Sequence, residues 1–179
     1  MLQADNAVLV VVDIQGKLAS LMDNKDEFYK NTVRMIEGAR VLDIPIIWNE
    51  QLPDKLGPTI PEIKAALEGA SPLVKKSFSC CGNSDFVARL KELKRRQILL
   101  VGMETHVCVY QTAQDLLADG YEVFAVADAI ASRSADNKLL GLATMKDLGA
   151  RMTSVEMALF EMLKYAEGER FKKVIQIVK

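Results

Sequence analysis

Short apolar runs alternate along the chain with longer segments in which apolar side chains recur every three or four residues. The run at residues 8–12 has no polar interruption, which is typical of a strand buried on both faces of a parallel sheet. Residues 26–42 place Tyr29, Val33 and Ile36 on one face and predict an amphipathic helix. The full pattern predicts strands at 8–12, 44–48, 72–75, 98–101, 122–126 and 151–155, and helices at 26–42, 62–67, 84–96, 107–118, 136–148 and 156–165.

Strands that alternate with helices of this length indicate an α/β protein whose parallel sheet is covered on both faces. Right-handed crossovers make a three-layer α/β/α sandwich the main candidate. No linker, repeat or low-complexity tract interrupts the pattern, so residues 1–179 are predicted to form one domain. Residues 51–59 carry Pro53, Gly57 and Pro58 and are predicted to be a loop. Residues 168–179 predict a further short element that could lie at a subunit contact.

Charge and composition exclude several classes of partner. The chain has 23 Lys and Arg against 24 Asp and Glu, and its basic cluster at residues 91–96 is typical of a solvated helix face, so nucleic acid is not expected. The apolar run at residues 7–12 is far shorter than the roughly 20 residues of a membrane span, so no membrane association is expected. Three cysteines, an odd number, and no signal-peptide pattern favour a reducing compartment, so we expect a cytoplasmic protein.

Polar residues follow several predicted strands. Ligands of an open parallel sheet bind beyond the carboxyl ends of its strands, which is where these residues lie. Asp13 ends the first strand and is followed by Gln15, Lys75 ends the third, and a turn after the fourth leads to Cys108 at the start of a helix. A carboxylate, an ammonium and a thiol are therefore expected at one edge of the sheet. Alternatives stay open for each residue: Asp13 as a turn cap, Lys75 as a surface lysine, Cys108 as a small core residue, and Gln15 as a substrate contact or a turn cap.

The position of Cys108 predicts nucleophilic chemistry. A helix start and a nearby ammonium both favour a thiolate, so the pKa of the thiol is expected to be lowered. Asp13 could accept the thiol proton and deliver it to a leaving group, and backbone N–H groups of the turn could bind an oxyanion. Glu104, in the same turn, could orient Lys75 or a neighbouring loop.

The other reactive side chains have weaker patterns. His106 is the only histidine, so it cannot form a multi-histidine metal site, and a structural role is favoured over a pair with Cys108. Cys80 and Cys81 are adjacent rather than spaced as a redox C-x-x-C motif, so packing is favoured for both. A redox protein that uses these two thiols remains an alternative.

Three segments carry a family resemblance: "VLVVVDIQGKL" around Asp13, "VKKSFSC" around Lys75, and "LLVGMETHVCVYQTAQDLLADGYEVFAVADAIASR" around Cys108. They resemble the isochorismatase-like cysteine hydrolases over nearly the whole chain. Two further segments, "EQLPDKLGPTIPEI" and "GARMTSVEMALFEML", look most similar to the isochorismatase domain-containing branch. The resemblance implies a six-stranded parallel sheet in the order 3-2-1-4-5-6.

The same resemblance implies a catalytic triad of Cys108, Asp13 and Lys75, in which the family's Lys-x-x-aromatic-Ser pattern selects Lys75 over Lys76. It also implies a cis peptide in the turn before the nucleophile, at Met103–Glu104, which would aim the N–H groups of Glu104 and Cys108 at one oxyanion. Family members are commonly homo-oligomers, so a dimer or a larger assembly is expected.

Two departures narrow the expected activity. The nicotinamidase branch binds a metal through histidines after its second strand, but residues 48–51 here read WNEQ, so no metal and no other cofactor is expected. True isochorismatases lack the cysteine. The prediction is a metal-independent cysteine hydrolase that cleaves the carbon–nitrogen bond of a small amide or carbamoyl compound through an acyl-enzyme. The predicted substrate pocket contains Gln15, Trp48, Gln51 and Phe78. The alternative from another class is a catalytically silent binding or assembly protein on the same scaffold.

Overall fold

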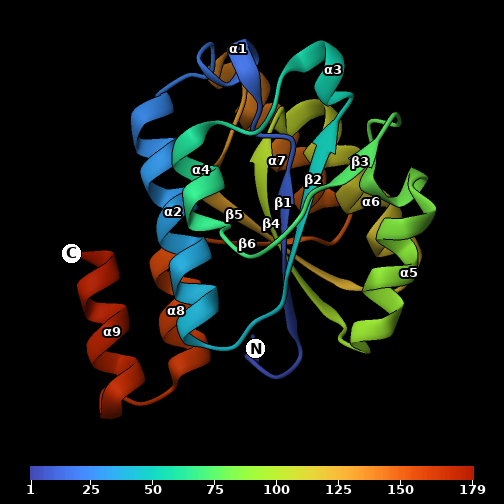
Figure 1. Ribbon diagram of the computed structural model, residues 1–179. Helices are drawn as coiled ribbons and strands as arrows, with labels where there is room; N and C mark the ends of the chain where they lie inside the picture. Colours follow the sequence, from blue (N-terminus) through green and yellow to red (C-terminus); the bar gives the residue numbers. More distant parts are fainter.

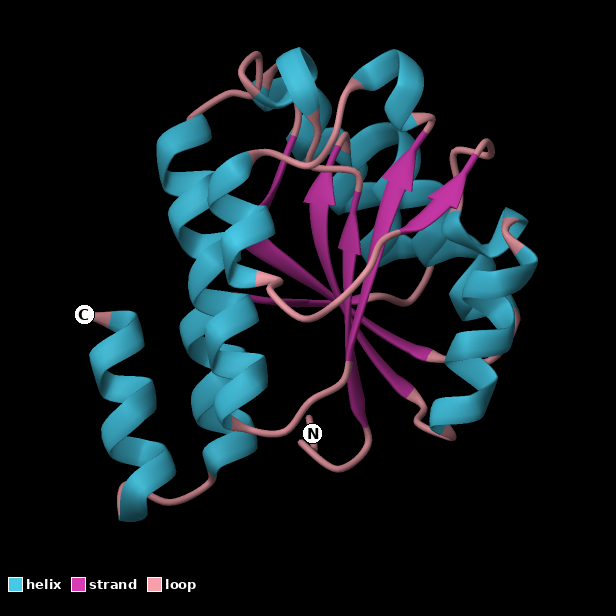
Figure 2. Ribbon diagram, viewed as in Figure 1, coloured by secondary structure: helices cyan, strands magenta, loops and turns pink.

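The computed structural model describes residues 1–179 and contains one six-stranded parallel sheet (Figures 1 and 2). The strand order is β3-β2-β1-β4-β5-β6, so the predicted order is confirmed. The strands are β1 (Ala7–Val12), β2 (Ile46–Gln51), β3 (Leu73–Lys75), β4 (Gln97–Met103), β5 (Glu122–Ala131) and β6 (Arg151–Thr153).

Helices cover both faces of the sheet, which confirms the three-layer sandwich (Figure 1). One face is covered by α2 (Lys25–Val41), α4 (Pro61–Ala66) and α8 (Val155–Leu163), with α9 (Gly168–Val178) outside α2 and α8, and the other by α5 (Ser84–Leu93), α6 (Tyr110–Ala118) and α7 (Ala135–Asp147). Two short helices, α1 (Gly16–Ala19) and α3 (Pro53–Leu56), lie beyond the carboxyl ends of the strands. None of the helices combines the length and the apolar character that crossing a bilayer requires.

The central strand β1 supplies side chains to two separate cores. Leu9 and Val11 point to the core under α2 and α8, whereas Val8, Val10 and Val12 point to the core under α5 and α6. All six residues of β1 are fully buried. This explains why its sequence is continuously apolar rather than alternating, since each buried aliphatic side chain contributes about 1.5–3 kcal/mol.

The second strand lies further along the chain than predicted. The expected strand at 44–48 begins at Ile46 and runs on through the polar residues Asn49, Glu50 and Gln51. These three side chains are buried and hydrogen-bonded. The strand therefore continues through polar residues beyond Trp48, where the apolar pattern ends. The predicted loop at 51–59 contains α3, which begins at Pro53.

The C-terminal segment forms the amphipathic helix α9, which packs beside α2 and α8 (Figure 1). Val174 is its buried residue and belongs to the core of that face. Arg170 of α9 also forms a salt bridge with Asp43, just after α2. The expected short element is therefore present, and it covers the protein's own helices.

Candidate active site

Four adjacent strands bring polar side chains to the carboxyl edge of the sheet. Asp13 follows β1, Gln51 ends β2, Lys75 ends β3, and Cys108 lies in the turn after β4. Lys75 Nζ is 2.6 Å from Asp13 Oδ2, and Cys108 Sγ donates to Gln51 Oε1 at 3.4 Å. The structure thus places the carboxylate, the ammonium and the thiol in one cluster, as the sheet order requires.

The Lys75 side chain is fully buried and surrounded by oxygen atoms. Its ammonium donates to Asp13 Oδ2, to Gln51 Oε1 at 3.3 Å, and to the carbonyl oxygens of Ser77 at 3.0 Å and Phe78 at 2.8 Å. A buried ammonium is tolerated only where such partners replace its water. The segment that follows β3 therefore folds back to hold Lys75 in place.

Asp13 has one oxygen engaged and one free. Lys75 takes Oδ2, while Oδ1 is buried without a hydrogen-bond partner. Burial raises the pKa of Asp13 above its ordinary value, against the opposing effects of Lys75 and of the neighbouring Cys108 thiol. The residue adopts a left-handed backbone conformation, with φ of 52°, which turns the chain sharply at the end of β1. This geometry leaves Oδ1 available to accept a proton.

Cys108 lies in a π-helical turn, Thr105–Val109, that leads into α6. The residue is 8% exposed, and burial raises the pKa of its thiol to about 12, with the Asp13 carboxylate as the next cause and Lys75 opposing both. The expected lowering of this pKa is therefore wrong, because loss of hydration outweighs the nearby ammonium. Cys108 is a protonated thiol beside a carboxylate.

The turn between β4 and Cys108 is made without a cis peptide. Every peptide bond in the chain is trans, so the expectation for Met103–Glu104 is wrong. Gly102, with φ of 138°, and the wide π-helical turn provide the change of direction instead, and Glu104 O accepts hydrogen bonds from the N–H groups of Val107 and Val109. The N–H of Glu104 makes no hydrogen bond to the rest of the chain.

A second polar cluster, formed by Glu104, His106, Ser132 and Arg133, supports the turn that carries Cys108. Glu104 does not contact Lys75; its carboxylate lies 2.5 Å from Arg133 Nε and 3.4 Å from His106 Nδ1. Ser132, which is fully buried, accepts from the N–H of Thr105 at 3.0 Å and lies 3.1 Å from His106 Nδ1. His106 therefore contacts Glu104 and Ser132, in agreement with a structural role. Ser132 and Arg133 end the family segment quoted around Cys108, but the apolar pattern did not single them out, because they follow a strand that extends beyond its predicted end.

The four residues expected to line a pocket lie in different places. Gln51 contacts both Lys75 and Cys108. Gln15 is fully buried and hydrogen-bonds the backbone of Gln51 and the carbonyl of Gly57. The Phe78 side chain is 53% exposed, and only its carbonyl reaches Lys75.

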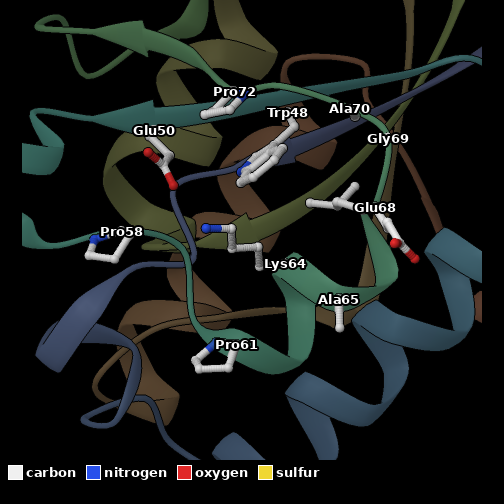
Figure 3. A pocket seen from close by; sticks show the side chains of 11 residues that line it. Trp48, Glu50, Pro58, Pro61, Lys64, Ala65, Glu68, Gly69, Ala70 and Pro72 are labelled. Carbon is white, nitrogen blue, oxygen red and sulfur yellow. The ribbon is translucent and has the colours of Figure 1, made fainter.

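Trp48, the fourth expected pocket residue, lines a cavity elsewhere. This cavity lies beside α4, on the face of β2 that carries Trp48 and Glu50 rather than Gln51 (Figure 3). Asp13, Lys75 and Cys108 do not line it.

The other two cysteines are free thiols. Cys80 is packed in the core, and its N–H donates to Thr112 Oγ1, which in turn donates to the carbonyl of Cys108. Burial raises the pKa of Cys80, and burial also raises the pKa of Cys81 to about 11. Thr112 is thus a link between two cysteine segments that the sequence did not reveal. No group of three or more His, Cys, Asp or Glu side chains is arranged as a metal site.

The fold and this edge define a class of protein: a three-layer α/β scaffold with a thiol, a carboxylate and an ammonium clustered at the carboxyl edge of a parallel sheet. The chain belongs to the isochorismatase family, since residues 7–157 match the isochorismatase domain. Isochorismatase domain-containing protein 2A of Mus musculus is 35% identical over 98% of this chain and 84% of its own length. The secreted isochorismatase effector Isc1 of Phytophthora sojae is 33% identical over 97% of this chain and 85% of its own length.

Two solved structures agree with this assignment. The MAR1 ribonuclease of Caenorhabditis elegans has a TM-score of 0.92 at 35% identity, with 99% of this chain and 91% of that chain covered. YcaC from Pseudomonas aeruginosa, described with hexane-2,5-diol and covalent acrylamide, has a TM-score of 0.92 at 26% identity, with 98% and 90% covered. The chain therefore has the scaffold of an isochorismatase-family hydrolase.

Proposed function

We propose that this protein is a cysteine hydrolase that cleaves the carbon–nitrogen bond of a small amide or carbamoyl compound. Cys108 is the nucleophile, Asp13 is the acid and base, and Lys75 fixes Asp13. The observation that carries the proposal is that the two oxygens of the Asp13 carboxylate have different surroundings. Oδ2 is bound by Lys75 at 2.6 Å, whereas Oδ1 is buried without a hydrogen-bond partner near the Cys108 thiol. A buried unpaired carboxylate oxygen is costly, which supports a role in proton transfer.

The proton needs of the reaction match these groups. As Cys108 Sγ attacks the carbonyl carbon, its proton passes to Asp13, so no free thiolate has to exist beforehand. The tetrahedral intermediate collapses, the carbon–nitrogen bond breaks, and Asp13 gives its proton to the leaving nitrogen. Asp13 then takes a proton from water, which attacks the thioester. The acid product leaves, and the proton returns to the sulfur.

The developing oxyanion requires a hydrogen-bond donor near the sulfur. The N–H of Glu104 makes no other hydrogen bond and belongs to the turn that carries Cys108, which supports the proposal that Glu104 and Cys108 N–H groups bind the oxyanion. The contacts of Glu104 with Arg133 and His106 restrain this turn. Lys75 acts through Asp13, because its ammonium is enclosed by four oxygen atoms.

Two relatives are relevant to the proposed chemistry. The YcaC structure from Pseudomonas aeruginosa is described with covalent acrylamide, a small amide whose alkene alkylates nucleophilic side chains. The Caenorhabditis elegans relative is described as a ribonuclease. An RNA substrate therefore belongs in any activity test of this chain.

The test is a panel of primary amides, ureas and N-carbamoyl compounds with a short RNA included, assayed for ammonia, amine or nucleotide release. We expect turnover of at least one amide or carbamoyl compound and a mass adduct on the Cys108 peptide after an acid quench. Cys108→Ala should abolish both, and Asp13→Asn should lower kcat by about 100-fold or more. Cys81→Ala is the matched control, because Cys81 lies outside the cluster.

Two results would contradict the proposal. Hydrolysis of an amide or of RNA that survives Cys108→Ala would remove the nucleophile. Absence of turnover, together with slow and similar alkylation of all three thiols, would favour the catalytically silent binding protein.

Assembly and location remain separate predictions. YcaC of Escherichia coli, which shares the fold at 24% identity, is described as an octameric hydrolase, and one relative from Phytophthora sojae is described as secreted. For this chain we propose a homo-oligomer in the cytoplasm. Light scattering of the purified protein and fractionation of the cells that produce it test these two points.

A further inference from the structure

A cavity of about 720 Å³ lies beside α4, away from the Asp13–Lys75–Cys108 cluster. Trp48 and Glu50 of β2 form its inner wall, and α4 with the segments on either side of it lines the rest (Figure 3). Neighbouring residues of a strand point to opposite faces, so Gln51 reaches the cluster while Glu50 faces the cavity. The volume is in the range of small-molecule sites.

Most polar groups of the inner wall already form hydrogen bonds within the protein, and one carboxylate oxygen does not. Trp48 Nε1 donates to Thr59 Oγ1 at 2.8 Å, and Glu50 Oε1 accepts from both the N–H and the hydroxyl of Thr59 at 2.7 Å. Glu50 Oε2 accepts no hydrogen bond and keeps access to the cavity, although the residue is only 6% exposed. The free groups of the wall are therefore an indole ring and one carboxylate oxygen.

An indole ring beside an unpaired, largely buried carboxylate is suited to an organic cation. The carboxylate accepts hydrogen bonds from an ammonium, and the indole offers its negative face to the same charge. Pro58, Pro61 and Ala65 supply apolar walls for a hydrocarbon body. Of the charged side chains around the cavity, Glu68 adds a negative charge and Lys64 a positive one, so the lining keeps a net negative charge.

We propose that this cavity binds a small primary ammonium compound with an apolar body, with the ammonium on Glu50 Oε2 and the body against Trp48. Figure 3 shows the Lys64 side chain extending along the cavity with its nitrogen end toward Glu50. Lys64 is solvent-exposed, so it competes with the ligand electrostatically without filling the site. The proposal does not depend on the hydrolase activity.

The chain has one tryptophan, so tryptophan emission comes from Trp48, which lines this cavity. The probes are cyclohexylmethylamine, its neutral analogue cyclohexylmethanol, and cyclohexanecarboxylate, titrated at neutral pH and constant ionic strength. We expect a saturable change in Trp48 emission with the amine, affinity about tenfold weaker for the alcohol, and no binding of the carboxylate. Cys108→Ala should leave the amine affinity unchanged.

Two variants separate the contributions of the wall. Glu50→Gln keeps an acceptor for Thr59 and removes the charge, so it should weaken amine binding about tenfold and leave alcohol binding unchanged. Lys64→Met should strengthen amine binding, because it removes the competing cation.

Several outcomes would overturn the proposal. They are equal affinity for amine and alcohol, preferred binding of the carboxylate, no saturable change in emission, or a folded Glu50→Gln protein that binds the amine normally. If Glu50→Gln does not fold, the comparison of the three probes on the unaltered protein and the direction of the Lys64→Met effect decide the matter.

Discussion

The Gln15 side chain hydrogen-bonds both the N–H and the C=O of Gln51. Gln15 Oε1 accepts from the N–H of Gln51 at 2.7 Å, and Gln15 Nε2 donates to the carbonyl of Gln51 at 3.2 Å and to that of Gly57 at 2.7 Å. The side chain of one glutamine thus fixes the backbone of the other. Because Gln51 Oε1 accepts from both Lys75 and Cys108, Gln15 acts on the cluster without touching it.

Replacing Gln15 should therefore lower both stability and activity. Gln15→Leu leaves the buried N–H and C=O of Gln51 unpaired, and we expect the free energy of unfolding to fall by about 2–4 kcal/mol. Urea denaturation measures this loss. The matched control is Gln97→Leu: Gln97 is also buried and makes two hydrogen bonds to backbone, but at the opposite end of the sheet.

The control should lose stability and keep its kcat. At a temperature where both variants are fully folded, Gln15→Leu should turn over more slowly than Gln97→Leu. Equal kcat values in the two variants would show that the hydrogen bonds between Gln15 and Gln51 have no role beyond folding.

Lys75→Met should be strongly destabilising. It leaves the Asp13 carboxylate buried without its cation, and breaking a buried ion pair costs about 3–5 kcal/mol. The exposed neighbour Lys76 provides the control, since Lys76→Met should change the free energy of unfolding by less than about 0.5 kcal/mol. A loss below about 1 kcal/mol in Lys75→Met would mean that Asp13 does not stay charged when Lys75 is removed.

The order of thiol alkylation distinguishes catalysis from simple exposure. Burial raises the pKa of Cys81 to about 11 and that of Cys108 to about 12, and Cys80 is fully enclosed. Exposure and pKa alone would make Cys81 react first with iodoacetamide. If Asp13 takes the thiol proton during attack, Cys108 should react first instead.

Peptide mapping by mass spectrometry identifies the modified cysteine at each time point. Asp13→Asn should return the order to Cys81 before Cys108. Should Asp13→Asn leave the rate at Cys108 unchanged, Asp13 is not its base.

The pH dependence of kcat/KM should show an acid limb that belongs to Asp13. Burial raises the pKa of this carboxyl above 3.8, and only the ionised form accepts the thiol proton, so activity should rise through a value above 3.8. Lys75 lowers the pKa of Asp13, so residual activity of Lys75→Gln should have its acid limb at higher pH. The pKa of Cys108 is about 12, so no second limb from the thiol is expected between about pH 7 and 10.

The raised pKa of Asp13 also makes the free energy of unfolding depend on pH. The folded protein binds the Asp13 proton more tightly than the unfolded chain does, because its pKa is raised in the fold. The contribution of Asp13 to the free energy of unfolding should therefore decrease as the pH rises from 3.8 through the folded pKa. Thermal melts of the protein and of Asp13→Asn across this range measure the difference; a growing advantage of the unaltered protein with rising pH would contradict it.

Much of the sheet could be predicted because its signals are local. The continuous apolar run of β1 follows from burial on both faces, and Asp13 marks its end. The juxtaposition of Asp13, Lys75 and Cys108 follows from sheet topology, since the carboxyl ends of parallel neighbours share one edge. These inferences need no knowledge of side-chain packing.

Other features depend on the tertiary structure and left no local signal. The polar end of β2 has the sequence character of a loop. It is a strand because its polar groups find hydrogen-bond partners in distant segments, among them Gln15 and Thr59. The direction of the Cys108 pKa was predicted from a helix start, but the depth of burial, which is set by the whole fold, decides it. The Trp48 cavity depends on how α4 packs beside the sheet, which the sequence pattern does not fix.

Thr59 contacts both the cavity beside α4 and the segment that supports the Asp13–Lys75–Cys108 cluster. It binds Glu50 and Trp48 on the cavity side, and it pairs through an isolated bridge with Gln15, which hydrogen-bonds the backbone of Gln51 at the carboxyl edge of the sheet. Insertions or deletions in residues 51–58, which precede it, would alter both regions at once. We therefore expect a change of substrate preference that arises in this stretch to alter the proposed ligand cavity beside α4 as well.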